Sequence, residues 1–155
     1  MFGVIHLLVL GRGFAMKIKD IMSKKVVAVE LDDNLRVVKE LFDKTNFHHL
    51  AVVHDGKLYG VISDRDLLKS ISPNIGTMAA TSKDMATLNK KVHQIMTRQP
   101  ITSDEESSVY DAIRIFNKNK ISCIPIVRDG EYIVGMVSWR DILRNIEKTM
   151  APEIG

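Results

Sequence analysis

The sequence contains one pattern twice, and this internal duplication constrains the fold more than any other feature. Gly60–Leu68 and Gly135–Leu143 both read Gly, two apolar residues, Ser, any residue, Arg, Asp and two apolar residues. Two earlier segments, Lys17–Ser23 and Lys91–Thr97, match each other in the same order. One residue inserted into the second hairpin accounts for the difference in spacing. A pattern repeated in register along a chain indicates two copies of one structural unit.

Each copy predicts the element order β-α-β-β-α. Apolar residues at helical spacing predict the long helix, short apolar runs predict strands, and an Asp-Gly pair predicts a hairpin turn. One copy is too small to hold a good core alone, so we expect an α+β fold in which the copies pack sheet to sheet with pseudo-twofold symmetry. The first copy predicts strand Val26–Val29, acidic cap Asp32-Asp33, helix Leu35–Phe42, strand Leu50–Val53, turn Asp55-Gly56 and helix Arg65–Ser70. The second copy predicts strand Ile101–Thr102, acidic cap Asp104-Glu105, helix Val109–Phe116, strand Ile124–Val127, turn Asp129-Gly130 and helix Arg140–Met150.

The connector between the copies is longer than most loops. It begins with turn residues around Pro73 and becomes helical from Ser82, a cap candidate, through Leu88. It is either a spacer that lets the copies dock or a mobile segment near a ligand site. The expected domains are leader 1–15, first repeat 16–69, connector 70–90, second repeat 91–150 and tail 151–155.

The leader does not resemble the rest of the chain. Its apolar run, Val4–Leu10, is far shorter than the roughly 20 residues needed to span a bilayer. No basic region precedes the run, which counts against a secretory signal. We therefore expect Met16 to be the natural start and residues 1–15 to be an upstream extension, with a functional anchor as the alternative.

Composition favours an ordinary soluble protein. The formal charge of +3 is mildly basic, and the cations are scattered in pairs such as Lys24-Lys25 rather than gathered in a stripe. This is a weak nucleic-acid signal. The single Cys123 excludes an internal disulfide and is expected to be a small buried hydrophobic residue. We expect a cytoplasmic protein.

The repeated Ser-x-Arg-Asp segment has two interpretations. Each copy changes there from strand to helix, and backbone N–H groups at a helix start favour anions. Asp66 and Asp141 could also accept hydrogen bonds from a polyol such as a ribose. The structural alternative is a capping box, in which Ser caps the helix and the acidic residue bonds back to the cap N–H.

Other motifs argue against catalysis and metal binding. His48, His49 and His54 lie close in sequence, but no neighbouring Cys or suitably spaced carboxylate completes a metal site. The chain has no P-loop, and Gly11–Gly13 is not a dinucleotide fingerprint. No nucleophile with a paired base is recognisable, so we do not expect an enzyme.

Taken together, these motifs resemble a tandem pair of CBS domains, also called a Bateman module. The resemblance rests on the duplicated unit, the openings Asp20–Ser23 and Gln94–Thr97, the strand Ile124–Val127 and the two Ser-x-Arg-Asp segments. It covers nearly the whole chain after the leader. We therefore expect a stand-alone CBS-domain protein.

The resemblance implies binding of adenosine-containing ligands, such as AMP, ADP, ATP or S-adenosylmethionine, in clefts between the repeats. It also implies a homodimer that forms a disc of four modules. In the second copy, Asp141 would bind the ribose hydroxyls, Ser138 would contact phosphate or ribose, and Arg140 would contact phosphate. Adenine contacts would come from Ile101, Thr102, Cys123, Ile124 and Pro125.

The first copy departs from the pattern of the second. The corresponding set of residues is Ser63, Arg65, Asp66, Val27, His49 and Leu50. Ala51 stands where the second copy has Pro125, and His48-His49 replaces Ser122-Cys123. Without the Pro, the backbone of this strand is less restricted. The two imidazoles could narrow the adenine site or contact a phosphate. We expect the second copy to be the better site.

The leading hypothesis is a non-catalytic sensor in which ligand binding changes the activity of a protein partner. The alternatives are a nucleic-acid-binding regulator and an interaction scaffold without a ligand. Turnover of ATP that is lost on mutating Asp141 would instead indicate a hydrolase or transferase. Trp139 would either lie over a ligand or form a dimer contact, and large exposed aromatic residues favour the contact.

Overall fold

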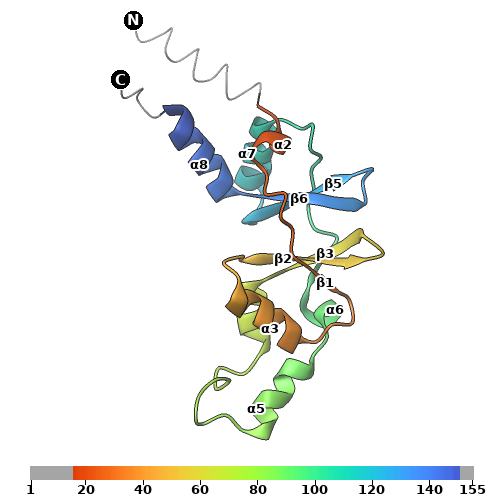
Figure 1. Cartoon of the computed structure of the whole chain (residues 1–155), viewed down its shortest axis with the longest axis vertical. Coiled ribbons are helices and arrows are strands. Elements are labelled where there is room, and N and C mark those ends of the chain that lie inside the picture. The colour runs from red at the N-terminus through yellow and green to blue at the C-terminus, as the bar shows by residue number, and fades with distance from the viewer. Residues whose placement is uncertain (1–15, 151–155) are drawn as a thin grey trace, which may run out of the picture. The chain divides into compact units, whose positions relative to one another are not determined.

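The computed structural model describes residues 16–150 (Figure 1). The predictions for the leader 1–15 and the tail 151–155 lie outside this range. The described chain forms two compact units. The N-terminal unit holds residues 26–100, and the C-terminal unit combines residues 16–25 with residues 101–150. No helix in the described range is both long enough and apolar enough to cross a membrane.

The N-terminal unit is built on strands in the order β1-β2-β3-β4. β1 pairs in parallel with β2, and the β2–β3 and β3–β4 pairs are antiparallel. The elements are β1 (Ala28–Glu30), α3 (Leu35–Lys44), β2 (His49–His54), β3 (Lys57–Ser63), α4 (Asp64–Ser70), α5 (Ser82–Ala86), the 3-10 helix η1 (Thr87–Asn89), α6 (Val92–Ile95) and β4 (Thr97–Arg98).

The C-terminal unit repeats this plan with a smaller sheet. β5 and β6 form an antiparallel hairpin, and Ser103 makes an isolated parallel bridge to Ile126. The elements are α2 (Ile18–Ile21), α7 (Val109–Lys118), β5 (Cys123–Arg128), β6 (Tyr132–Ser138) and α8 (Trp139–Met150). The mixture of helices and sheet confirms the predicted α+β class.

The opening segments of the two repeats are exchanged between the units. α2 opens the first repeat but lies in the C-terminal unit, where Ile18 is fully buried and Ser23 exchanges two backbone hydrogen bonds of 2.9 and 3.0 Å with Met136. α6 opens the second repeat but lies in the N-terminal unit, where Val92 N donates to Asp33 O at 2.8 Å. Each unit therefore completes its core with a segment of the other repeat.

The Gly that begins each repeated pattern lies where the exchanged segment crosses a strand. A Cβ atom on Gly135 would lie 2.5 Å from Met22 Sδ. A Cβ atom on Gly60 would lie 2.7 Å from Thr97 O. Real Cβ atoms do not make contacts this short. Glycine at these positions thus lets the exchanged segment approach the strand closely.

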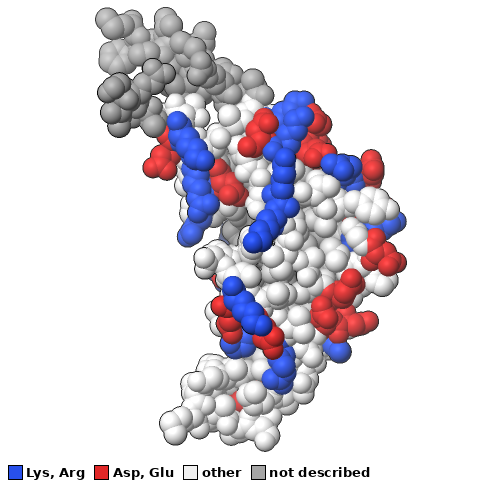
Figure 2. Space-filling view, viewed as in Figure 1, with Lys and Arg blue, Asp and Glu red and all other residues white. Residues whose placement is uncertain are grey.

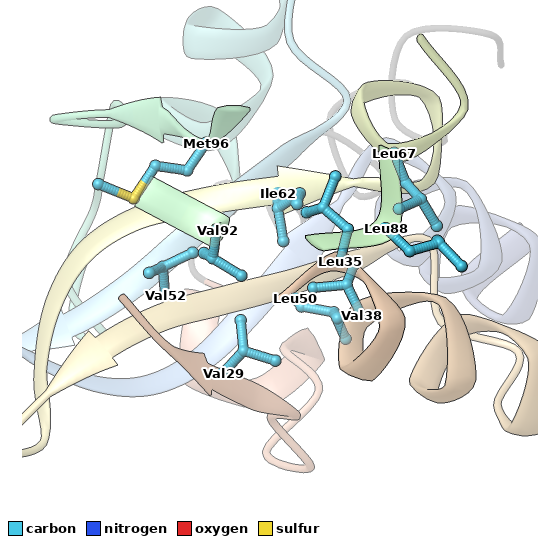
Figure 3. Close-up of a cluster of buried hydrophobic side chains, with 10 residues drawn as sticks. All are labelled: Val29, Leu35, Val38, Leu50, Val52, Ile62, Leu67, Leu88, Val92 and Met96. Carbon is cyan, nitrogen blue, oxygen red and sulfur yellow. The ribbon is translucent and has the colours of Figure 1, made fainter. Parts of the chain in front are cut away.

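Each unit has its own hydrophobic core. In the N-terminal unit, side chains from α3, α4, α6, η1 and the sheet converge (Figure 3). These side chains are Val29, Leu35, Val38, Leu50, Val52, Ile62, Leu67, Leu88, Val92 and Met96. The core of the C-terminal unit consists of Ile18, Val109, Ala112, Ile124, Ile126, Val137 and Ile142. Most of these residues occupy corresponding positions in the repeat, so one pattern of apolar residues builds both cores.

Both predicted hairpin turns are confirmed. Asp55 and Gly56 have φ values of 50° and 74°, and Asp129 and Gly130 have φ values of 53° and 73°. Two consecutive positive φ values characterise the turns that join antiparallel strands most tightly. The second loop contains one more residue, Glu131, which is the insertion expected from the spacing of the repeats.

The predicted acidic caps of the long helices were wrong. Asn34 caps α3, and Ser108 caps α7. The acidic side chains bind backbone N–H groups in the preceding turns instead: Asp33 Oδ2 accepts from Glu30 N at 2.9 Å, and Asp104 Oδ1 accepts from Ser107 N at 2.9 Å. Several neighbouring polar residues could cap each helix, and the sequence does not rank them.

The predicted strand Ile101–Thr102 was also wrong, because Pro125 has no N–H to donate. In the first copy, Ala51 N donates to Val27 O at 3.0 Å and extends the parallel pairing. At the equivalent place in the second copy only the Ser103–Ile126 bridge forms.

In the connector, the predicted helix is present and begins at Ser82 as expected, but its cap is the residue before. Thr81, not Ser82, caps α5, and its hydroxyl accepts from Asp84 N at 3.2 Å. The helix ends earlier than expected, since residues 87–89 form the 3-10 helix η1.

Candidate functional site

The Ser138 corner, which we define as Ser138 to Asp141, joins β6 to α8. Ser138 N and Ser138 Oγ both donate to Asp141 Oδ2, at 2.7 and 2.8 Å. Asp141 N donates back to Ser138 Oγ at 3.3 Å. The capping box considered from the sequence is therefore present. Both bonds to the carboxylate use Oδ2, so the cap does not use the second carboxylate oxygen, Oδ1.

The Ser63 corner, Ser63 to Asp66, has the same arrangement at the start of α4. Ser63 N and Ser63 Oγ donate to Asp66 Oδ2 at 2.9 and 2.7 Å, and Asp66 N donates to Ser63 Oγ at 3.2 Å. Here too the cap uses Oδ2 and not Oδ1 of the carboxylate. Duplication has thus preserved the side-chain geometry as well as the residue types.

A capping box alone does not identify a site in this protein. Ser108 and Asp111 form the same box at the start of α7, with hydrogen bonds of 2.6 to 3.2 Å, and lie outside the repeated motif. The two corners differ from this box because each lies beside the first residue of a strand. Cys123 pairs with Ser138 across the β5–β6 hairpin, and His49 pairs with Ser63 across the β2–β3 hairpin.

The carboxylates of the two corners act on the titration of these strand residues. Burial, and then the Asp141 carboxylate, raises the pKa of the Cys123 thiol to about 12. Burial lowers the pKa of His49, although the carboxylates of Asp64 and Asp66 act in the opposite direction. The Ser138 corner therefore has the neutral thiol of Cys123 beside its carboxylate. The Ser63 corner has the imidazole of His49, whose protonation is disfavoured by burial.

The predicted adenine-contact residues differ in what they can offer a ligand. Leu50 and Ile124 are fully buried in the two cores, so only their backbone groups are available. Pro125 is fully buried as well. Val27 is half-buried, whereas Ile101 is 40% exposed.

Thr102 is exposed and directly precedes Ser103, which bridges to β5. It is the one residue of the predicted set that lines a shallow open hollow of about 490 Å³ near the turn of the β5–β6 hairpin. That hollow lies at the other end of the hairpin from Ser138. It is lined by Thr102, Ser103, Asp104, Glu105, Glu106, Val127, Arg128, Asp129 and Gly130.

The variable residue of each corner makes a contact that the sequence analysis missed. In the Ser63 corner, Asp64 Oδ2 lies 2.8 Å from His48 Nδ1. In the Ser138 corner the equivalent residue is Trp139, and the Arg140 guanidinium lies 5.5 Å from the centre of its ring. The two corners therefore carry different charges around the same Ser-Asp frame. The signal was visible as the one position at which the repeated motif changes from acidic to aromatic.

Across residues 16–150, no group of three or more His, Cys, Asp or Glu side chains is placed to hold a metal ion. His48 and His54 instead lie beside carboxylates, with His54 Nδ1 3.4 Å from Glu30 Oε2.

Comparison with protein families gives two matches to the CBS domain model, over residues 18–73 and 92–148. The chain is 31% identical over 137 residues to a CBS domain-containing protein of Dictyostelium discoideum, covering 87% of this chain and 94% of the relative. It is 32% identical over 131 residues to the uncharacterized protein MJ1232 of Methanocaldococcus jannaschii, covering 84% of this chain. It spans only 40% of the length of MJ1232.

Solved structures show the same fold. The CBS domain of a CBS domain containing membrane protein from Sphaerobacter thermophilus matches with a TM-score of 0.79 and 27% identity, over 91% of this chain and 94% of that one. The CBS domain pair of protein MJ0100, in complex with 5′-methylthioadenosine and S-adenosyl-L-methionine, matches with a TM-score of 0.71 and 28% identity. That match covers 87% of this chain and 98% of the other.

Proposed function

This chain belongs to the CBS domain family, and we propose that it is a non-catalytic sensor that binds an adenosine-containing ligand at its Ser-Asp corners and thereby alters a partner protein. The observation that carries the proposal is the repeated corner, in which one carboxylate oxygen is used by the helix cap and the other is not. CBS-domain pairs are generally regulatory modules.

The chemistry of the second oxygen suits a ribose. Asp141 Oδ1 can accept hydrogen bonds from the two neighbouring hydroxyls of the sugar, while the cap keeps the carboxylate in one orientation. Hydrogen bonds to a charged group each contribute about 1.5 to 3 kcal/mol. Two such bonds, together with burial of the base, would support micromolar affinity, or roughly −8 kcal/mol.

The proposed ligand class comes from the relatives as well as from the corner. Protein MJ0100 is described in complex with 5′-methylthioadenosine and S-adenosyl-L-methionine. We extend that class to this chain, with AMP, ADP and ATP as the further candidates. Arg140 and Arg65 are the proposed phosphate contacts for the nucleotides, and Ser138 and Ser63 are proposed to contact ribose or phosphate.

We also propose a homodimer and a cytoplasmic location, as the resemblance to stand-alone CBS proteins implies. Light scattering coupled to size-exclusion chromatography tests the dimer, since a mass of 17.5 kDa would indicate a monomer.

Isothermal titration calorimetry with 5′-methylthioadenosine, S-adenosylmethionine, AMP, ADP and ATP tests the ligand proposal. The informative variants are Asp141→Asn and Asp66→Asn, because Asn keeps an oxygen that can accept from the cap N–H groups. Asp111→Asn is the matched control, since Asp111 closes the same capping box outside the motif.

We expect one of these compounds to bind saturably and to lose about tenfold in affinity, or 1.4 kcal/mol, in Asp141→Asn but not in Asp111→Asn. Asp66→Asn then reports whether the first corner binds. If none binds below the millimolar range, or if the control weakens binding equally, the corners are helix caps and the proposal is wrong.

A further inference from the structure

The two Ser-Asp corners differ in charge at a single position of their repeated motif. Asp64 follows Ser63 in the first corner, whereas Trp139 follows Ser138 in the second. The other charged residues of the motif, one Arg and one Asp, are common to both corners. The Ser63 corner therefore carries one more negative charge than the Ser138 corner.

The extra carboxylate is held in place at the Ser63 corner. Asp64 Oδ2 lies 2.8 Å from His48 Nδ1, and the backbone N–H of Asp64 donates to His48 O at 3.1 Å. These two contacts join the residue before β2 to the first turn of α4. The Asp64 side chain is 39% exposed, so its charge is not covered by a layer of other side chains.

The neighbouring His49 does not cancel this negative charge at neutral pH. Burial lowers its pKa, although the carboxylates of Asp64 and Asp66 act in the opposite direction, so the imidazole stays neutral. Figure 2 shows Lys and Arg side chains interspersed with Asp and Glu over the visible face, without a broad region of one sign. We therefore attribute the charge difference between the corners to their own side chains.

The Ser138 corner offers a ligand nearly neutral surroundings. Trp139 is 45% exposed, and the Arg140 guanidinium lies 5.5 Å from the centre of its ring, within the range of a cation–π contact. Burial raises the pKa of the Cys123 thiol to about 12, so this neighbour is uncharged as well. The positive charge of Arg140 therefore lies beside an aromatic ring at the position where the first corner has a carboxylate.

We infer that Asp64 and Trp139 determine the ligand specificity of the two corners: the Ser63 corner selects adenosine ligands whose 5′ group is uncharged or cationic, whereas the Ser138 corner also accepts a phosphate. This inference rests on the proposed ligand function. A carboxylate beside a phosphate brings like charges together, which selects against that ligand. Solvent screens a partly exposed carboxylate, so we expect discrimination of about tenfold rather than complete exclusion.

The alternative is a purely structural role for Asp64. An acidic residue in the first turn stabilises a helix, and the contact with His48 also joins α4 to the segment before β2. In that case the charge of Asp64 would not affect the choice of ligand. The two interpretations therefore differ in a measurable ratio of affinities.

Two ligands that share the adenosine group test the inference. 5′-Methylthioadenosine has an uncharged 5′ group, whereas AMP carries a phosphate dianion at pH 8, because the second pKa of a phosphate is about 6. Asp141→Asn weakens the second corner and so reports the Ser63 corner, and Asp66→Asn reports the Ser138 corner. Isothermal titration calorimetry of each variant gives the ratio of the AMP dissociation constant to that of 5′-methylthioadenosine.

Further substitutions move the charge in each background. Asp64→Asn removes it from the Ser63 corner and keeps an oxygen that can accept from His48. Asp55→Asn is the matched control, because it removes the same charge from the turn at the other end of the β2–β3 hairpin, where Asn tolerates the φ of 50°. Trp139→Asp places the charge in the Ser138 corner, and Trp139→Asn controls for loss of the ring.

We expect the ratio to be about tenfold higher at the Ser63 corner than at the Ser138 corner. Asp64→Asn should remove most of this difference, and Asp55→Asn should leave it unchanged within about twofold. The difference should also shrink in about 1 M salt, where charges are screened beyond about 3 Å. Trp139→Asp, but not Trp139→Asn, should raise the ratio at the Ser138 corner.

Three results would overturn the inference while leaving the ligand function in place. The first is an equal ratio at the two corners, or a lower ratio at the Ser63 corner. The second is an equal effect of Asp64→Asn and Asp55→Asn, which would indicate a general effect of net charge. The third is binding at the Ser138 corner with no binding of 5′-methylthioadenosine at the Ser63 corner. If neither compound binds either corner, the proposed ligand function itself is wrong, and Asp64 has only its structural role.

Discussion

Replacing the two pattern glycines by Ala should destabilise the protein to different degrees. At Gly60 the new Cβ would lie 2.7 Å from the backbone oxygen of Thr97, an atom that cannot move without displacing β4. At Gly135 the first contact is the flexible Met22 side chain, at 2.5 Å, and the nearest backbone oxygen, Ser23 O, is 3.1 Å away. A flexible side chain can yield, whereas a paired backbone cannot.

Added atoms in a packed site cost about 1 to 3 kcal/mol, occasionally more. We expect Gly60→Ala to fall at the upper end of this range and Gly135→Ala at the lower end. Shortening Met22 to Ala removes the nearest contact at Gly135. In that background the penalty of Gly135→Ala should shrink to below about 0.5 kcal/mol, because Ala also reduces the entropy of the unfolded chain. The equivalent Met96→Ala should not rescue Gly60→Ala, since Thr97 O stays in place.

Urea unfolding of the single and double variants measures these free energies, with Trp139 fluorescence reporting the C-terminal unit and far-ultraviolet circular dichroism reporting both. The double-mutant cycle isolates the coupling between the two sites. A coupling energy near zero for Met22 with Gly135, or full rescue of Gly60→Ala by Met96→Ala, would refute the account of how the exchanged segments are seated. A changed slope with denaturant would indicate an altered unfolded state instead.

Three further predictions concern single residues. Burial lowers the pKa of His49 from 6.5, so its contribution to stability is present above pH 6.5 and is lost as the pH falls through the lower folded pKa; urea unfolding as a function of pH should show this slope in the wild type and not in His49→Gln. The raised pKa of Cys123, about 12, predicts negligible alkylation by iodoacetamide at neutral pH until the chain is unfolded; rapid modification of the folded protein would contradict it. Gln99 has a φ of 46°, which favours Gly, so Gln99→Gly should raise the free energy of unfolding by about 0.5 kcal/mol rather than lower it.

The local elements could be predicted because they depend on neighbouring residues. The amphipathic pattern of α7 and the Asp129-Gly130 turn are specified within a few positions of the chain. The exchange of α2 and α6 could not be predicted in this way, because a pattern of apolar residues states that Ile18 is buried but not in which core. The paired glycines were the available signal, since a Gly preceding two apolar strand residues in both copies indicates a close crossing.

The sequence predicts the hydrogen-bonded Ser-Asp pair of the candidate site, but not the contacts that the neighbouring residues make. The Ser138–Asp141 geometry follows from a capping pattern that the sequence displays directly. The contact between Asp64 and His48 depends on the pairing of β2 with β3, which brings together residues that are distant along the chain. The ligand roles of these residues stay predictions, and so do the repeat boundaries and the packing of the two repeats against each other.

The exchanged opening segments mean that neither core is built from one repeat alone, since Val92 of the second repeat lies in the core of the N-terminal unit and Ile18 of the first repeat lies in the core of the C-terminal unit. A protein with a single repeat would still carry its own opening helix, but in this arrangement that helix fills the core of the other repeat. It would therefore reach the same fold only by trading first helices with a second molecule, as a domain-swapped dimer does. Joining two repeats in one polypeptide turns that association into an internal event at a high effective concentration. The chain therefore resembles a domain-swapped dimer whose two halves are joined in one polypeptide. If the chain were cut between the repeats, the folded fraction would depend on protein concentration.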